Sequence, residues 1–176
     1  AVELKPDYYQ ALTNLAKLIS ERFTDYSEAK ALFEKSLQIY PAAEGALNDY
    51  GNLLRKRFGD AGGAKRQYEK ACNVNPDDDK AWYNLGVLFE LNVKDYEKAI
   101  AYYEAALQRN PLKADAHYNL GNIYTSHVEN VELAKGHYEK AIEIKSDYAA
   151  AYFNYAQLLR TLNDQAAGKI NYIKAT

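Results

Sequence analysis

The side chains best suited to chemistry in this sequence are three histidines at a regular spacing. His117, His127 and His137 lie ten residues apart, so each is turned by about 280° around a helix relative to the one before it. Two ligands that hold one metal ion from one helix are four residues apart and share a face. No pair of these histidines does so, and His117 stands where we expect core packing. The sequence therefore predicts no metal site.

The rest of the sequence assembles no reactive centre. Cys72 is the single cysteine, which excludes disulfides within the chain, and it falls in an apolar column with Leu37, Leu107 and Ile142, each 35 residues from the next. We therefore expect a buried thiol. The sequence has no glycine-rich phosphate-binding loop. It predicts no catalytic residue, no cofactor and no enzymatic activity.

The elements that position side chains in this chain follow a period of 35 residues. The stretch AWYNLGVLFE, residues 81–90, returns as AHYNLGNIYT at residues 116–125. The same columns run through the whole chain: Leu12, Leu47, Trp82, His117 and Tyr152; Leu15, Tyr50, Leu85, Leu120 and Tyr155; Ala29, Ala64, Ala99 and Ala134; Phe33, Tyr68, Tyr103 and Tyr138; Pro6, Pro41, Pro76 and Pro111. A fixed period of this length indicates an array of structural repeats.

Each repeat has the pattern of two helices. Trp82, Leu85 and Phe89 follow a helical apolar spacing, and a second run of the same kind covers residues 96–103. Asp95 is expected to cap the second helix. A short helix pair cannot bury its apolar stripe alone, so neighbouring pairs must stack. The sequence predicts an all-α solenoid.

These columns resemble the tetratricopeptide repeat (TPR) family. Its pattern W-x2-L-G-x2-Y, then A-x3-F, then P, is met by Trp82, Leu85, Gly86, Phe89, Ala99, Tyr103 and Pro111. The resemblance implies a right-handed superhelical solenoid of tandem helix-turn-helix TPR units, one array over residues 1–176. We expect a helix tail at 1–6 and repeats at 7–41, 42–76, 77–111, 112–146 and 147–176.

One departure from the family is regular. The family unit has about 34 residues, whereas four units here hold one more residue between their helices. Four apolar residues stand near the position where the family often has glycine: Phe23, Phe58, Val93 and Val128. We therefore expect each first helix to run longer and to bury one more apolar side chain.

Composition and charge restrict the partners and the location. The chain has 176 residues, 48% hydrophobic, and a net charge of −2, which favours neither nucleic acid nor an anionic membrane. No apolar run is long enough to span a bilayer. With one cysteine and no signal-peptide pattern, we expect a cytoplasmic protein. The chain opens in mid-repeat and lacks Met, so we expect a piece of a longer array that self-associates end to end through its terminal repeats.

The side of each first helix that faces away from the core is expected to line a concave groove, as the resemblance implies. One column of this side carries amide-like side chains: Asn14, Asp49, Asn84, Asn119 and Asn154. An amide both donates and accepts, so a row of them can bind successive peptide groups of an extended ligand. The column resembles the asparagine ladder of O-GlcNAc transferase. The alternative is that asparagine is simply common in this slot of the family.

A neighbouring column is aromatic in its C-terminal half. Tyr83, Tyr118 and Phe153 would form an exposed apolar strip, which is typical of a binding site; alternatively, each ring leans onto the next repeat and is half buried. Further residues complete the predicted peptide-binding groove: Asn52, Val87, Asn122, Gln157, Lys80 and Arg55. They make it mostly uncharged.

These features predict a non-catalytic scaffold that binds an extended peptide segment of a partner protein. Two alternatives stay open: an architectural spacer without a ligand of its own, or single-stranded RNA binding of the pentatricopeptide kind. The RNA alternative requires a basic groove, and Asp49, Glu90 and Asp115 lie on that side. The clamp of Lys and Arg with which some tetratricopeptide domains bind a C-terminal carboxylate is not supplied by these columns.

Overall fold

The computed structural model describes residues 8–23 and 25–162. Over these residues the fold is all-α, with no strand, and no helix there is long and apolar enough to cross a membrane. The helices form two compact units, residues 1–94 and 95–176. The predicted helix tail at 1–6 and the end of the last predicted repeat, from residue 163, lie outside the described residues.

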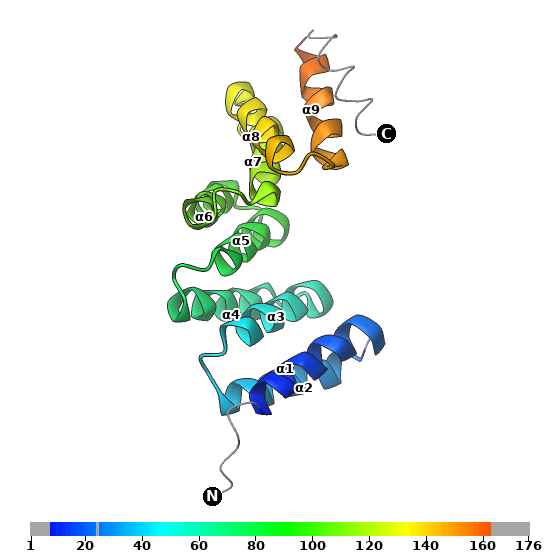
Figure 1. The fold of residues 1–176 in the computed structure, drawn as a ribbon, viewed down its shortest axis with the longest axis vertical. Coiled ribbons are helices and arrows are strands. Elements are labelled where there is room, and N and C mark those ends of the chain that lie inside the picture. Colours follow the sequence, from blue (N-terminus) through cyan, green and yellow to red (C-terminus); the bar gives the residue numbers. More distant parts are fainter. Residues whose placement is uncertain (1–7, 24, 163–176) are drawn as a thin grey trace, which may run out of the picture. The chain divides into compact units, whose positions relative to one another are not determined.

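Unit 1 is built from helix pairs in which each helix turns back on the one before it (Figure 1). Its elements are, in chain order, α1 (Tyr8–Leu18), the π-helical turn η1 (Ile19–Phe23), α2 (Tyr26–Ile39), α3 (Glu44–Leu53), η2 (Leu54–Phe58), α4 (Ala61–Val74), α5 (Asp79–Leu88) and η3 (Phe89–Val93). α1 packs on α2, α3 on α4, and successive pairs stack through α2 on α3 and α4 on α5.

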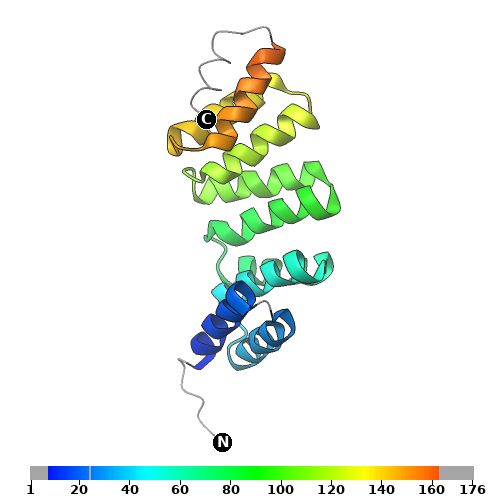
Figure 2. The same ribbon diagram turned by 90° about the vertical axis from the view of Figure 1, so that its right-hand side faces the viewer.

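Unit 2 repeats this arrangement, and the second view shows its helices stacked in the same way (Figure 2). Its elements are α6 (Tyr96–Arg109), α7 (Ala114–Ser126), α8 (Val131–Ile144) and α9 (Ala149–Thr161). α7 packs on α8, and these two helices are joined to the others through α6 on α7 and α8 on α9. The prediction of an all-α repeat solenoid is confirmed.

The second helix of each repeat begins at a side-chain cap. The carboxylate or amide oxygen of the capping residue accepts the backbone N–H three residues further on, which would otherwise be unsatisfied. The caps lie 35 residues apart: Asp25, Asp60, Asp95 and Asn130. The cap predicted at Asp95 is confirmed, and the same rule fixes the start of α2, α4, α6 and α8.

The core of each unit contains large aromatic rings on the second helices. Phe33, Tyr68, Tyr103 and Tyr138 are fully buried. Gly51 lies so close that a Cβ there would be 2.5 Å from a ring carbon of Tyr68. At Gly121 the corresponding distance to Tyr138 is 2.7 Å. Glycine is required in these first helices because the ring packs directly on their backbone.

The extra residue of the 35-residue unit is taken up by a widened last turn of the first helix. Gly59 donates its N–H to the carbonyl of Leu54, five residues earlier, and Lys94 donates likewise to Phe89. Such i→i−5 bonds define a π-turn. The chain then reverses through a left-handed residue, at Gly59, Lys94 and Glu129, so the left-handed position also recurs every 35 residues.

The π-turns correct one prediction. The first helices do run longer, but the four apolar residues near the turn are not buried. Their exposed fractions are 69% for Phe23, 41% for Phe58, 49% for Val93 and 46% for Val128. The residue that turns inward is the first of the widened turn instead: Ile19, Leu54 and Phe89 are buried.

Two further core expectations need correction. Leu15, a member of a predicted apolar column, is exposed, and Leu18 one turn later is exposed as well. The residues 35 positions later, Tyr50 and Leu53, are buried by the preceding helix pair. Trp82 is half-buried rather than buried, and so is His117 in the same column. The indole N–H of Trp82 donates to the carbonyl of Pro76 in the preceding loop. Cys72 is buried, as predicted.

Candidate functional site

The predicted groove residues lie at the surface or partly exposed, and none of them is buried. Asn14, Lys80, Phe153 and Gln157 are exposed, and the others are half-buried: Asp49, Asn52, Arg55, Tyr83, Asn84, Val87, Tyr118, Asn119, Asn122 and Asn154. Asn48, which precedes Tyr83 in the aromatic column, is buried. Tyr83, Tyr118 and Phe153 therefore lie outside the hydrophobic core.

In unit 1, Asn14 lines a pocket between α1 and the start of α3. The pocket has a volume of about 350 Å³, and its other walls are Tyr9, Gln10, Thr13, Tyr40 and residues 42–46. Gly45 forms part of the wall, and a Cβ at this position would meet no atom within 4 Å. The pocket is open and polar on the α1 side.

A second pocket of unit 1 contains the charged part of the predicted groove. Asp49 and Asn52 line a space of about 240 Å³ with Lys17, Glu21 and three residues at the end of the α3–η2 segment, Leu53, Lys56 and Arg57. Lys17 Nζ is 3.9 Å from Asp49 Oδ2. Burial raises the pKa of Asp49, and the Lys17 charge opposes this shift. This pocket suits a charged group.

The buried tyrosine of α4 reaches the groove side of unit 1 with its hydroxyl. Tyr68 donates to Asn52 Oδ1 at 3.0 Å. Burial raises the pKa of Tyr68, while the neighbouring Arg55 lowers it. Asn52 and Arg55 are thus held partly by a core residue. The sequence pattern alone did not predict the contact between Tyr68 and Asn52. A tyrosine in a buried column nevertheless indicates that its hydroxyl needs a hydrogen-bond partner.

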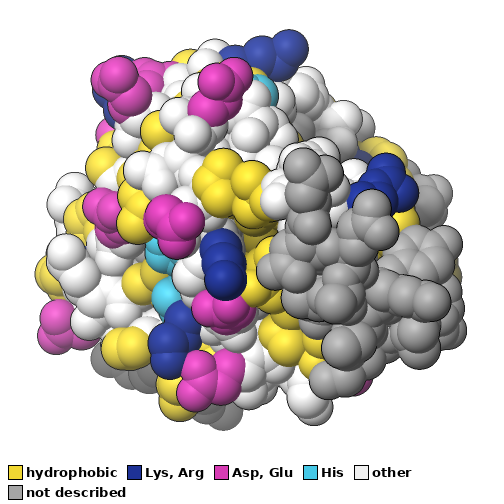
Figure 3. All heavy atoms as spheres, turned by 90° about the horizontal axis from the view of Figure 1, so that it is seen from above, with side chains coloured by type: hydrophobic (Ala, Val, Ile, Leu, Met, Phe, Trp, Pro, Cys, Tyr) yellow, Lys and Arg dark blue, Asp and Glu magenta, His cyan; other side chains and the backbone are white. Residues whose placement is uncertain are grey.

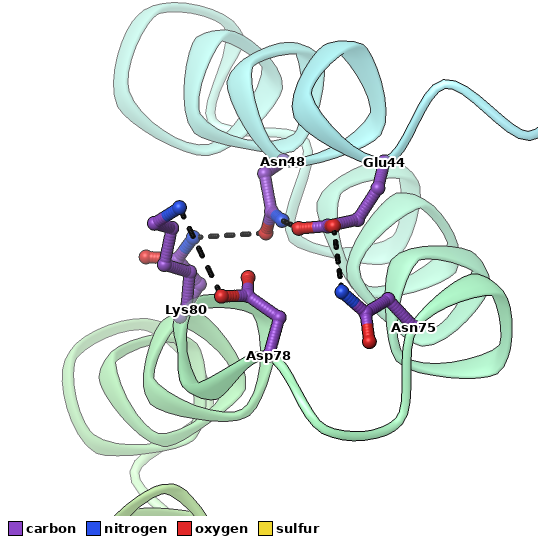
Figure 4. Close-up of polar contacts among 6 residues, drawn as sticks. Glu44, Asn48, Asn75, Asp78 and Lys80 are labelled. Carbon is purple, nitrogen blue, oxygen red and sulfur yellow. Dashed lines mark hydrogen bonds and ion pairs between the residues drawn. The ribbon is translucent and has the colours of Figure 1, made fainter. Parts of the chain in front are cut away.

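Asn84, on α5, takes part in a polar network with the start of α3 (Figure 4). It donates to Asn48 Oδ1 at 3.2 Å, and Asn48 donates to Glu44 Oε1 at 3.3 Å. Glu44 Oε2 accepts from Asn75 at 3.1 Å. Asn84 and Asn48 are therefore bonded to each other, and Asn48 is bonded to the carboxylate of Glu44. The sequence pattern did not indicate a role for Glu44.

The predicted cation Lys80 belongs to the same network. Its Nζ is 3.8 Å from Asp78 Oδ1, and Asp78 Oδ2 is buried without a hydrogen-bond partner among the described residues. Burial raises the pKa of Glu44, and the nearby Asp78 carboxylate raises it further. Glu44 and Asp78 therefore form an acidic pair between α3 and the start of α5, in which the pKa of Glu44 is raised.

In unit 2, Asn119 and Tyr118 bond to neighbouring helices. Asn119 donates to the hydroxyl of Tyr103 at 3.0 Å. The residue that precedes Tyr103 by 16 positions is Val87, whereas Tyr68 has Asn52 at that distance. The Tyr103 hydroxyl therefore accepts from an amide of the next repeat, whereas the Tyr68 hydroxyl donates to Asn52. The ring of Tyr118 contacts Tyr138 and Tyr148, with centroid distances of 6.4 and 5.0 Å.

The structure brings Asn122 and Asn154 together on the groove side of unit 2. Asn154 Nδ2 donates to Asn122 Oδ1 at 2.8 Å and to the Tyr118 hydroxyl at 3.1 Å. The hydroxyl of Tyr138 donates to the same Asn122 oxygen at 2.8 Å. Asn122, Tyr138 and Asn154 line a pocket of about 280 Å³ whose other walls are Thr125, Ser126, Gln157, Leu158 and Thr161. No wall of this pocket is charged.

Two of the histidines form a contact between helices that their spacing along one helix does not indicate. His117 on α7 and His137 on α8 do meet, with their Nδ1 atoms 3.0 Å apart. His117 Nε2 lies 3.2 Å from the carbonyl of Pro111, which can only accept, so Nε2 carries the proton and His137 donates to His117 Nδ1. Counting residues along one helix could not reveal a pair that two helices form.

The His117–His137 pair holds no third ligand. Among the residues that the structure describes, no group of three His, Cys, Asp or Glu side chains is placed to hold a metal ion. Burial lowers the pKa of His137 to about 4, with the His117 charge adding to the effect. In Figure 3, histidine side chains lie at the surface beside lysine and acidic side chains.

Sequence comparison identifies the repeats. Models of the tetratricopeptide repeat match residues 67–101 and 90–147. A search of curated proteins found no match.

Solved structures show the same fold. A crystal structure of MamA has 24% sequence identity and a TM-score of 0.77, covering 90% of this chain and 91% of that chain. PilF of Pseudomonas aeruginosa has 20% sequence identity and a TM-score of 0.86, and the match covers 95% of this chain and 74% of that chain. The TPR protein YrrB has 20% sequence identity and a TM-score of 0.68, and the match covers 93% of this chain and 82% of that chain. By its repeats and its fold, the chain belongs to the tetratricopeptide repeat family, whose members are in general non-catalytic scaffolds for protein–protein interaction.

Proposed function

We propose that this protein binds an extended peptide segment of a partner in the concave groove of its first helices. The observation that carries the proposal is the state of the aromatic column: Tyr83 and Tyr118 are half-buried, and Phe153 is 42% exposed. Apolar side chains that are kept out of a core and flanked by polar ones are typical of interaction sites.

A polar pocket lies among the sequence neighbours of Phe153 on α9. In unit 2, Asn154 follows Phe153 directly and lines the uncharged pocket, together with Gln157 one turn further along α9. A peptide needs both kinds of surface, since an apolar anchor supplies affinity and amide groups satisfy its backbone. YrrB, which has this fold, is described as a TPR protein with an unusual peptide-binding site, and this supports a peptide ligand here.

A selection from a library of random-sequence peptides, displayed on phage and presented to the immobilised chain, tests the proposal. We expect peptides to be enriched, and their affinity to fall about tenfold or more for the double variant Phe153→Ala/Gln157→Ala. Both side chains are exposed on α9, so the melting temperature should change little. Fluorescence polarisation with the synthesised peptides measures the affinity.

The matched control is Leu133→Ala on α8, which removes a side chain of similar exposure, 45% against 42% for Phe153, from the second helix of a pair. It should leave the affinity unchanged. Failure to enrich any peptide, or equal losses in Leu133→Ala and the double variant, would contradict groove binding and favour the architectural spacer.

A further inference from the structure

The groove of unit 2 contains one arrangement that specifies more than a generic peptide surface. Asn122 and Asn154 hydrogen-bond to each other, and each is bonded again by a tyrosine. Asn122 Oδ1 accepts two hydrogen bonds, from Asn154 and Tyr138, which uses both of its lone pairs. Asn154 Nδ2 donates two, to Asn122 and Tyr118, which uses both of its hydrogens.

What these two amides have left is complementary. Asn122 keeps its NH2 group as a donor, and Asn154 keeps its carbonyl oxygen as an acceptor, with no partner for either among the described residues. Both residues line the same pocket of about 280 Å³, in which the other polar walls are the hydroxyls of Thr125, Ser126 and Thr161 and the amide of Gln157. A ligand group that satisfies both asparagines must accept a hydrogen bond from Asn122 and donate one to Asn154.

We infer that this pocket is a subsite for a carboxamide group of the bound peptide, with Asn122 as its donor and Asn154 as its acceptor. The inference rests on the proposed function. A carboxylate can only accept and an ammonium can only donate, so each would leave one asparagine unsatisfied. The absence of a charged wall, in contrast to the Asp49 pocket of unit 1, disfavours ionic groups as well.

The orientation of the pair is fixed before a ligand arrives. Tyr138 is 1% exposed, and its ring packs against Gly121, so its hydroxyl cannot follow a rotating amide. Preorganisation of this kind lowers the entropy lost on binding. Unit 1 has the first half of the device, Tyr68 bonded to Asn52, but there Asn84 donates to Asn48 instead. Within the described residues, an amide pair in which both asparagines are also bonded to a tyrosine occurs in unit 2.

Two sources of carboxamide fit this chemistry: a main-chain peptide group or an Asn or Gln side chain. N-methylacetamide mimics the first and propionamide the second, while propionate has the shape of propionamide but only accepts. We would titrate each compound into the full ¹⁵N-labelled chain and follow the side-chain NH2 signals of Asn122 and Asn154 by NMR. The result expected is a saturable shift of both signals with at least one amide and none with propionate.

The variants locate the effect. Asn122→Asp keeps the acceptor and removes the donor, and should abolish the response of Asn154. Tyr138→Phe should reduce it and alter the amide signals of Asn122 even without a probe, because the orienting hydroxyl is gone. Asn73→Asp, the same change at an exposed position of the second helix α4, is the control and should leave the response intact.

The outcomes are distinct. A shift with N-methylacetamide assigns the subsite to the peptide backbone, and a shift with propionamide alone assigns it to an Asn or Gln side chain; both support the inference. No shift with either amide, or equal shifts with propionate, overturns it. If library peptides still bind, and their affinity still falls when Phe153 is replaced, only the carboxamide subsite is refuted. The proposed function then stands.

Discussion

Tyr138 has its ring in the hydrophobic core of unit 2 and its hydroxyl 2.8 Å from Asn122 Oδ1 on the groove side. The same residue types meet in unit 1, where Tyr68 donates to Asn52 at 3.0 Å. The core and the proposed binding face are therefore coupled through single side chains. Packing changes under these rings are expected to reach the groove.

The close approach of Tyr138 to Gly121 predicts an asymmetric pair of glycine substitutions. Gly121→Ala places a Cβ 2.7 Å from the ring and should lower the free energy of unfolding by about 1–3 kcal/mol through overpacking. Gly136→Ala, in the middle of α8 with no atom within 4 Å of the new Cβ, should raise it by about 0.5–1 kcal/mol. Urea denaturation followed by circular dichroism measures both. Equal effects of the two changes would refute the packing argument.

The left-handed residues after the first helices predict another pair. Glu129 has φ of 54°, and Gly59 occupies the same position with φ of 64°. Side chains with a Cβ are disfavoured in this region by roughly 1–2 kcal/mol. Glu129→Gly should therefore raise the stability by up to about 1 kcal/mol, and Gly59→Ala should lower it by about 1 kcal/mol. A drop in melting temperature for Glu129→Gly would mean that its side chain matters more than its backbone.

The acidic pair of unit 1 predicts a dependence of stability on pH. The pKa of Glu44 is raised above 4.5 by burial and then by Asp78, so the folded chain binds this proton more tightly than the unfolded chain does. Its stabilising contribution is present below pH 4.5 and is lost as the pH rises through the raised pKa. Glu44→Gln should remove this dependence and raise the stability slightly at neutral pH.

Melting curves of the wild type and Glu44→Gln from pH 4 to pH 8 check this prediction. The matched control is Glu97→Gln, an exposed carboxylate on α6, which should follow the wild type at every pH. If Glu44→Gln instead loses stability at neutral pH, the carboxylate is needed as an acceptor for Asn48 and Asn75 more than its charge is harmful.

The His117–His137 pair predicts the opposite sign. The pKa of His137 is lowered to about 4 from 6.5 by burial and then by His117, so the unfolded chain binds the proton first. The stability contributed by the neutral pair is present above pH 6.5 and is lost as the pH falls towards 4. Burial also lowers the pKa of His117, and the charge of Lys140 lowers it further.

His137→Gln keeps a hydrogen-bond donor for His117 and should flatten the loss of melting temperature between pH 6.5 and pH 4. His127→Gln serves as its control. His127, at the end of α7, lies outside the pair and stacks on Tyr96 of α6. An unchanged acid limb in His137→Gln would show that other groups govern the acid stability of unit 2.

The distribution of charge in the groove predicts no binding of RNA. Glu44, Asp49 and Asp78 lie on or beside the groove of unit 1, and such groups repel a phosphate backbone. Mixed single-stranded RNA oligomers should therefore not be retained with the chain on filters at low salt. Tight retention that falls steeply with added salt would revive the pentatricopeptide alternative.

Local rules were enough to predict much of the fold. The 35-residue period gave the helix pairs, and the Asp95 cap and the burial of Cys72 followed from single positions and their immediate neighbours. The π-turn was not predictable in this way. One extra residue can enter a loop or widen a helix, and whether Phe58 or Leu54 turns inward depends on that choice.

The candidate site was predictable by column but not by contact. Helical periodicity placed Asn84, Asn122 and Asn154 outside the core, because it depends on one helix at a time. It could not show that Asn122 bonds to Asn154, or that His117 meets His137, because such contacts depend on the rotation of two helices about their own axes. The contacts of Glu44 with Asn75 and Asp78 were missed for the same reason, since Glu44 starts α3 and the other two lie in the loop between α4 and α5.

The exposed side of α1 offers a place where the protein can be lengthened by design. Leu15 and Leu18 are 44% and 47% exposed, while the residues one period later are covered by α2. A grafted copy of α2 would meet a surface of the kind it already covers on α3. An engineer could thus extend the array from this end with the protein's own modules and without new side-chain chemistry.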